Sequence, residues 1–95
     1  MEIKQVNGKP KGSFKAVEEG KEAGIIAYTW EGENQIIIDH TEVAPEFEGK
    51  GLAKKLVMET VAFAREKNLK IIPHCSYAQR IFERTEEIKD VLYRS

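Results

Sequence analysis

The sequence predicts a mixed α/β fold of the α+β class, in which a mostly antiparallel sheet is followed by a β-α-β crossover. The first half of the chain contains segments rich in β-branched and aromatic residues, separated by turn residues. From Gly51 onward the apolar residues recur with the period of a helix, and another short apolar segment follows. Two successive strands joined through a helix run parallel, so this helix makes the crossover.

Four strands are predicted before the helix, and residues that favour turns bound each of them. The strands are expected over residues 3–6, 14–17, 24–30 and 36–43. Short turns containing Gly8, Gly20 and Gly32 lie between them, which favours antiparallel pairing of neighbours. The three consecutive isoleucines of Ile36–Ile38 predict burial on both faces of the last strand.

An amphipathic helix is predicted between Gly51 and Asn68, because apolar and charged residues fall on different faces. Its apolar face consists of Ala53, Leu56, Val57, Thr60, Val61 and Ala64. Asn68 can take the left-handed conformation that ends a helix. The strand that follows, over residues 69–72, should stop at Pro73, which has no backbone N–H to donate.

Two shorter helices are predicted near the end of the chain. Ser76 followed by Gln79 matches a capping box, so a helix should begin at Tyr77 with Phe82 on its inner side. Thr85 would cap a last short helix. The apolar residues of that helix are Ile88, Val91 and Leu92.

The composition is typical of one small domain, predicted over residues 1–95. With 95 residues and 41% hydrophobic content, the chain can build one modest core. Its 15 Lys and Arg against 16 Asp and Glu give no overall field toward nucleic acid or an anionic membrane. No apolar stretch approaches the roughly 20 residues that cross a bilayer. A single cysteine and a polar N-terminus predict a cytoplasmic protein.

A glycine-containing loop between the fourth strand and the helix is the main candidate binding site. Gly49 and Gly51 let successive backbone N–H groups approach an anion, and the helix N-terminus adds about half a positive charge. Lys50, Lys54 and Lys55 supply further positive charge, so the loop fits a diphosphate. The alternative is that the glycines only shape a turn and the lysines are solvated.

The pattern V-x-P-E-[aromatic]-x-G-K-G-L-A-x-x-L, with its flanking strand and helix, resembles the acetyl-CoA-binding motif of the GNAT N-acetyltransferase superfamily. The resemblance spans Ile36 to Phe82 and implies a minimal GNAT-like fold, acetyl-CoA as cofactor and an amine as acetyl acceptor. By this resemblance, the cofactor-binding residues are Val43, Glu48, Gly49, Lys50, Gly51, Leu52, Ala53 and Lys54. Glu48 departs from the family's Gln or Arg, so its backbone N–H is expected to serve instead.

The resemblance also implies where the pantetheine arm and the leaving thiolate would lie. The arm would bind the backbone around Val43, in a gap between its strand and residues 69–72. The family's usual Asn and Tyr in the next helix correspond to Cys75 and Phe82, and Phe82 has no proton to donate. Residues 7–10 stand where the family has a helical excursion, and no strand pair follows the last helix, which implies an open acceptor side.

Three residues are candidates for catalysis. His40 lies near the end of the fourth strand and has a side chain suited to proton transfer, or it is a histidine satisfied beside the core. Cys75 lies at a helix start and could accept the acetyl group, protonate the CoA thiolate, or be inert. Tyr77 is either an acid at the cleft or a partly buried ring.

Three functions follow from these observations. The first is an N-acetyltransferase acting on an unidentified amine. The second is a non-catalytic module that binds CoA or acyl-CoA, and the third is a small interaction protein whose glycine loop is structural. No metal site is predicted, because His40, His74 and Cys75 do not form a recognisable ligand set. The sequence does not determine the oligomeric state.

Overall fold

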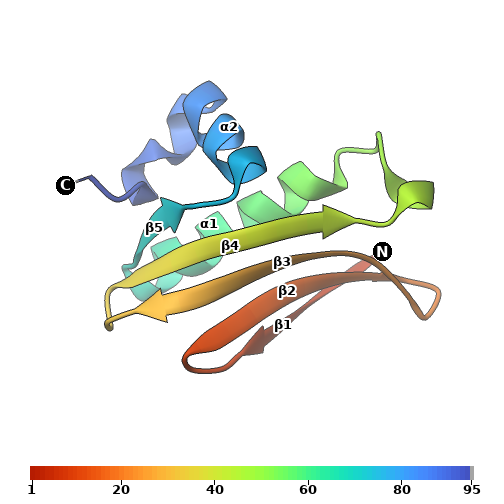
Figure 1. Cartoon of the computed structure of the whole chain (residues 1–95), viewed down its shortest axis with the longest axis horizontal. Helices are drawn as coiled ribbons and strands as arrows, with labels where there is room; N and C mark the ends of the chain where they lie inside the picture. The colour runs from red at the N-terminus through yellow and green to blue at the C-terminus, as the bar shows by residue number, and fades with distance from the viewer. Residues whose placement is uncertain (95) are drawn as a thin grey trace.

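The computed structural model describes residues 1–94, which form a five-stranded sheet with helices on one side (Figure 1). The elements are β1 (Glu2–Asn7), β2 (Lys11–Glu18), β3 (Lys21–Glu31), β4 (Gln35–Val43), the 3-10 segment η1 (Pro45–Phe47), α1 (Leu52–Lys67), β5 (Lys70–Pro73), α2 (Ser76–Arg84) and the 3-10 segment η2 (Glu86–Val91). All five predicted strands and the long helix are confirmed, with boundaries that differ by a few residues.

The strands are adjacent in the order β1-β2-β3-β4-β5. The pairs among β1 to β4 are antiparallel, whereas β4 and β5 are parallel and α1 connects them. The predicted antiparallel sheet and crossover are therefore confirmed. The parallel pairing is short and runs only from Gln35 opposite Lys70 to Ile38 opposite Pro73.

A β-bulge in β4 changes which of its side chains face the helix. Tyr28 pairs with Ile38 but its neighbour Ala27 pairs with His40, so Asp39 is the extra residue. Ile38 is fully buried on the side of α1, and the bulge puts Thr41 rather than His40 next on that side. A strictly alternating strand would have pointed His40 inward.

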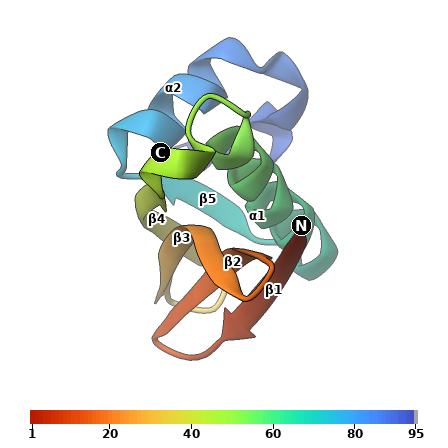
Figure 2. The ribbon, with the colours of Figure 1, turned by 90° about the vertical axis from the view of Figure 1, so that its right-hand side faces the viewer.

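The core lies between α1 and the sheet. Phe63 of α1 packs its ring against those of Phe14, Tyr28 and Trp30, with centroids 6.0, 5.7 and 6.2 Å away. The three elements α1, α2 and η2 contact one another on the same side of the sheet (Figure 2). Within residues 1–94 no helix covers the other face, so Ile37 is only half-buried there, unlike the predicted burial of all three isoleucines.

Both ends of α1 follow local backbone chemistry. Gly51 precedes the helix with φ of 75°, and Asn68 ends it in the left-handed conformation with φ of 56°. The predicted apolar face of α1 is buried except for Ala53, and Leu52 and Phe63 are buried in addition. Phe63 joins the core because its ring packs against the aromatic side chains of β2 and β3.

One prediction about the C-terminal part is wrong and another is confirmed. The predicted capping box is not formed: Cys75 takes the N-cap position and Ser76 is the first helical residue, because the Gln79 N–H donates to the Cys75 carbonyl at 3.0 Å. The predicted last short helix is confirmed: it is a 3-10 helix with Thr85 at its N-cap position, although the Thr85 side chain makes no capping hydrogen bond. Ile88 and Val91, both buried, are three residues apart and therefore share a face of a helix with three residues per turn.

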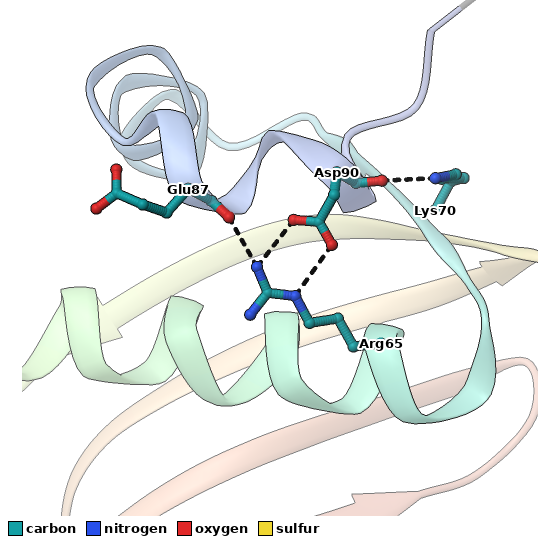
Figure 3. Close-up of polar contacts among 4 residues, drawn as sticks. All are labelled: Arg65, Lys70, Glu87 and Asp90. Carbon is teal, nitrogen blue, oxygen red and sulfur yellow. Dashed lines mark hydrogen bonds and ion pairs between the residues drawn. The ribbon is translucent and has the colours of Figure 1, made fainter.

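A polar cluster joins η2 to α1 and β5 (Figure 3). The Arg65 guanidinium donates to both carboxylate oxygens of Asp90, at 3.0 and 2.8 Å, and to the Glu87 carbonyl at 2.7 Å. The Lys70 ammonium donates to the Asp90 carbonyl at 2.5 Å. This cluster holds the C-terminal segment over the buried side chains of Ile88 and Val91.

None of the helices in the described part of the chain is long and apolar enough to cross a membrane.

Candidate functional site

The loop from η1 to α1 is built around two glycines in the left-handed region. Gly49 has φ of 79° and Gly51 has φ of 75°, a conformation that costs a side-chain-bearing residue roughly 1–2 kcal/mol. A Cβ placed on either glycine meets no described atom within 4 Å. The loop therefore uses glycine for its backbone conformation, and the space beside the backbone is open.

Six successive backbone N–H groups in this loop are free of backbone partners among residues 1–94. They belong to Gly49, Lys50, Gly51, Leu52, Ala53 and Lys54. The first helical hydrogen bond runs from the Lys55 N–H to the Gly51 carbonyl at 3.1 Å. No described side chain caps the helix, so its N-terminal donors and its positive dipole end are available to an anion.

A cavity of about 440 Å³ lies beside this loop. Its lining residues are Thr41, Val43, Phe47, Glu48, Gly49, Gly51, Leu52, Ala53 and Tyr77. The structure thus brings together seven of the residues predicted from the sequence. Of the remaining loop residues, Lys50 lines a smaller cavity of about 200 Å³ together with Lys55, and Lys54 is exposed.

β4 and β5 separate beside this cavity, as the resemblance to the GNAT superfamily implied. The Ile38 carbonyl accepts from the N–H groups of both His74 and Cys75, at 3.1 and 3.2 Å, and β4 then continues toward η1 paired with β3 but no longer with β5 (Figure 1). The Ala44 N–H donates to the Ala23 carbonyl at 2.9 Å on the β3 side. By strand alternation, the N–H and carbonyl of Val43 point to the other side, into the gap.

The backbone N–H of Glu48 was predicted to bind the diphosphate, but in the structure it already has a partner within the chain. This N–H donates to the Pro45 carbonyl at 3.3 Å, because Glu48 closes the turn of η1. The donors free for an anion therefore start one residue later, at Gly49. The side chain of Glu48 is exposed at the rim of the cavity.

Cys75 and Tyr77 lie on the α2 side of the gap. The half-buried Cys75 thiol donates to the Thr41 hydroxyl, with 3.6 Å between sulfur and oxygen. Burial raises the pKa of Tyr77, an effect that the positive charge of Arg80 partly offsets. The phenol therefore stays protonated through neutral pH and can donate a hydrogen bond into the cavity.

His40 lies apart from these residues. It pairs with Ala27 on the sheet face opposite α1, is exposed, and lies outside the lining of the cavity. The bulge at Asp39 is the reason, because it shifts the alternation of β4 so that Thr41, and not His40, faces α1. A role for His40 in proton transfer stays a prediction.

A second cavity, of about 530 Å³, lies on the other side of the end of β4. It shares Thr41, Val43 and Glu48 with the first cavity, and Glu22 and Glu42 contribute further carboxylates. The two cavities meet at the residues just beyond the bulge. Among residues 1–94, no three His, Cys, Asp or Glu side chains gather as a metal site would require.

Sequence reasoning missed Thr41 and Phe47. Phe47 is the aromatic position of the motif, after Glu46, and the motif alone does not indicate that this residue lines the cavity. No sequence pattern marks Thr41 as a site residue, because the side of the sheet that it faces depends on the bulge at Asp39. Phe82 is 2% exposed and packs in the core, which agrees with its lack of a transferable proton.

Comparisons with known proteins identify relatives of this chain. The model of the family described as GCN5-related N-acetyl-transferase matches residues 13–91. Protein NATD1 of Xenopus tropicalis and of mouse are 34% and 32% identical to this chain over 56 residues, which is 59% of this chain and 51% of either relative. The chain therefore spans about half the length of the curated relatives it matches.

Solved structures show the same similarity. The solution structure of a GCN5-like protein from Staphylococcus aureus has a TM-score of 0.73 and 38% identity, covering 99% of this chain and 89% of its own. A ribosomal-protein-alanine N-acetyltransferase from Brucella melitensis has a TM-score of 0.70 at 17% identity, covering 93% and 65%. An aminoglycoside N-acetyltransferase solved with CoA has a TM-score of 0.66 at 15% identity, covering 99% and 98%. The last two show likeness of fold alone.

Proposed function

The chain belongs to the GCN5-related N-acetyltransferase family, and on this premise we propose that it binds acetyl-CoA and transfers the acetyl group to an amine. The observation that carries the proposal is the run of six free backbone N–H groups from Gly49 to Lys54. These donors lie at the N-terminus of a 16-residue helix, where an anion is stabilised. Such an array suits the two neighbouring phosphates of CoA.

Lysine side chains would add to the binding of the diphosphate. Lys50, Lys54 and Lys55 are exposed around the start of α1 and supply positive charge from solvent. Glu48, at the cavity rim, opposes this field. The backbone donors must therefore supply most of the specificity, since their positions are fixed by the fold and do not depend on mobile side chains.

The thioester would lie farther into the cavity, between β4 and α2. The free backbone groups of Val43 face the gap and match the amides of a pantetheine arm. Tyr77 lines the same cavity, and the Cys75 thiol lies beside it through its contact with Thr41. The arm would thus place its sulfur near a phenol and a thiol.

In the proposed reaction the neutral amine nitrogen attacks the thioester carbonyl carbon, and the carbon–sulfur bond then breaks. The leaving CoA thiolate takes a proton, for which the Cys75 thiol or the Tyr77 phenol is our candidate source, and the proton that the acylated nitrogen loses restores that group. The amine must lose a proton before attack, and His40 is our candidate base, acting from the open face of the sheet.

A non-catalytic module that binds CoA is the second candidate function. One observation favours it: Phe82, at the position where the family commonly has its acid, is a core residue with 2% exposure. The binding module would use the same glycine loop and the same gap between β4 and β5 as the acetyltransferase. It differs in that no group donates a proton to the CoA thiolate, so no acetyl group is transferred.

Calorimetric titration tests the binding site. Acetyl-CoA should bind, and acetyl-pantetheine, which lacks the diphosphate, should bind at least about tenfold more weakly, since even one charge-assisted hydrogen bond contributes about 1.5–3 kcal/mol. Equal affinities would contradict the diphosphate site. No heat with either compound would contradict both CoA-based functions.

Release of free CoA thiol with a panel of small amines and lysine peptides separates the enzyme from the binding module. We expect Tyr77→Phe, Cys75→Ala and His40→Ala to slow release if these residues carry proton transfer. Tyr93→Phe is the control for the first, because Tyr93 is an exposed tyrosine near the C-terminus. Unchanged rates in all three variants would remove the catalytic assignments, and no release with any amine would favour the binding module.

A further inference from the structure

Thr41 occupies the junction of the two cavities at the end of β4. This residue lines both the cavity beside the glycine loop, of about 440 Å³, and the neighbouring cavity, of about 530 Å³. It is half-buried and faces the α1 side only because the bulge at Asp39 shifts the alternation of β4. A residue here is therefore in reach of whatever fills either cavity.

Thr41 also contacts the only cysteine of the chain. The Cys75 thiol donates to the Thr41 hydroxyl across 34 residues of sequence, with 3.6 Å between sulfur and oxygen. A hydroxyl can accept from a thiol and can donate to a thiolate, so this contact survives a change in the ionisation of the sulfur. The contact joins β4 to the N-cap of α2, on the two sides of the gap.

Threonine suits a directed hydrogen bond to Cys75 better than other side chains of its size. Two heavy atoms on Cβ restrict its χ1 rotation, so the hydroxyl has a defined direction. Valine would fill the same volume without the hydroxyl, and serine would keep the hydroxyl with less packing. These two replacements therefore separate hydrogen bonding from shape.

We propose that Thr41, which lines both cavities, is a positioning residue whose hydroxyl holds the Cys75 thiol next to this shared wall. This inference rests on the proposed function, because it places the thiol at the thioester end of the site for acetyl-CoA. Its first test is independent of turnover. Since Cys75 is the only cysteine, alkylation by iodoacetamide reports on this thiol alone.

We expect Thr41→Val to slow alkylation of Cys75 about three- to tenfold near pH 8, because the thiolate loses a donor, and Thr41→Ser to stay within about twofold of wild type. The matched control is Thr29→Val. Thr29 is also a half-buried strand threonine, and its hydroxyl donates to Asp39 at 2.5 Å, not to Cys75. Circular dichroism checks the folding of each variant, and Thr41→Ala replaces Thr41→Val if the latter does not fold.

The inference is overturned if Thr41→Val reacts like wild type and like Thr29→Val, or if Thr41→Ser reacts as slowly as Thr41→Val. In the wild type, saturating acetyl-CoA should also protect Cys75 from alkylation. Calorimetric binding without protection would overturn the placement of the thiol. If acetyl-CoA does not bind at all, the proposed function fails, while the comparison of the variants still decides the contact between Thr41 and Cys75.

Discussion

Replacing Gly51 with alanine tests whether the conformation of the loop, and not its composition, makes the anion site. Gly51 has φ of 75°, and a Cβ at this position would meet no described atom within 4 Å. Gly32 offers a matched control in the turn between β3 and β4. It has φ of 70° and equally open surroundings, but lies far from the cavity in the sequence and the sheet.

The expected loss of stability is the same for both variants. An alanine in the left-handed region costs roughly 1–2 kcal/mol, and the loss of freedom in the unfolded chain returns about 0.4–1 kcal/mol. The net change of about 1 kcal/mol corresponds to a fall in melting temperature of about 4–8 °C for a domain of this size. Thermal unfolding followed by circular dichroism measures this change.

Affinity for acetyl-CoA should separate the two variants. Relief of strain at residue 51 rotates the adjoining peptide, so at least one N–H of the array turns away from the diphosphate. Losing one charge-assisted hydrogen bond of about 1.5–3 kcal/mol weakens binding roughly 10- to 150-fold. Gly32→Ala should bind like wild type in the same calorimetric titration. If both variants bind equally well, the loop conformation is not what holds the cofactor, and the reasoning is refuted.

Three further changes test the core, the acid position and the C-terminal cluster. Phe82→Tyr should cost about 1–3 kcal/mol in urea denaturation without raising thiol release, because its hydroxyl would be buried in the core; faster turnover would contradict this. Phe63→Ala should cost about 3–5 kcal/mol in the same assay, and a loss below 1 kcal/mol would refute the central place of its ring. The hydrogen bonds from Arg65 hold the pKa of the Asp90 carboxyl below its usual value. The pair therefore contributes fully to stability at a pH above the pKa that Asp90 has in the unfolded chain. This contribution is lost as the pH falls through the lower pKa that Asp90 has in the folded protein. The difference in melting temperature between wild type and Asp90→Asn should therefore be present at pH 7 and vanish in strong acid. The control Glu86→Gln should melt close to wild type at either pH. A difference for Asp90→Asn that persists in strong acid would contradict the linkage between this pKa and stability.

Much of the fold could be predicted because it depends on local backbone chemistry. The turn at Gly32 separates two strands, and residues that accept positive φ lie just before and just after α1, at Gly51 and Asn68. The shift from strand to helix period at Gly51 predicted the crossover, and the crossover requires the parallel pairing of β4 and β5. These features need only short stretches of sequence.

The candidate site was predictable only in part. The loop residues from Gly49 to Lys54 are consecutive, so their shared location follows from the chain itself. Thr41 and His40 are also consecutive, yet their faces depend on which residues of β3 they pair with. The helix start is similar: whether Cys75 or Ser76 takes the N-cap position is decided by the hydrogen bond that Gln79 makes.

By itself, then, the sequence determined the order of the strands, the ends of the long helix and the glycine loop, because turns, helix ends and apolar periods are set by neighbouring residues. Only the tertiary structure decided that Thr41 lines the cavity and contacts Cys75, and that His40 faces the other way. The physical reason is that a single extra residue, Asp39, reverses the faces of the strand beyond it. That reversal exists only in the register between β3 and β4, which no segment of either strand specifies alone.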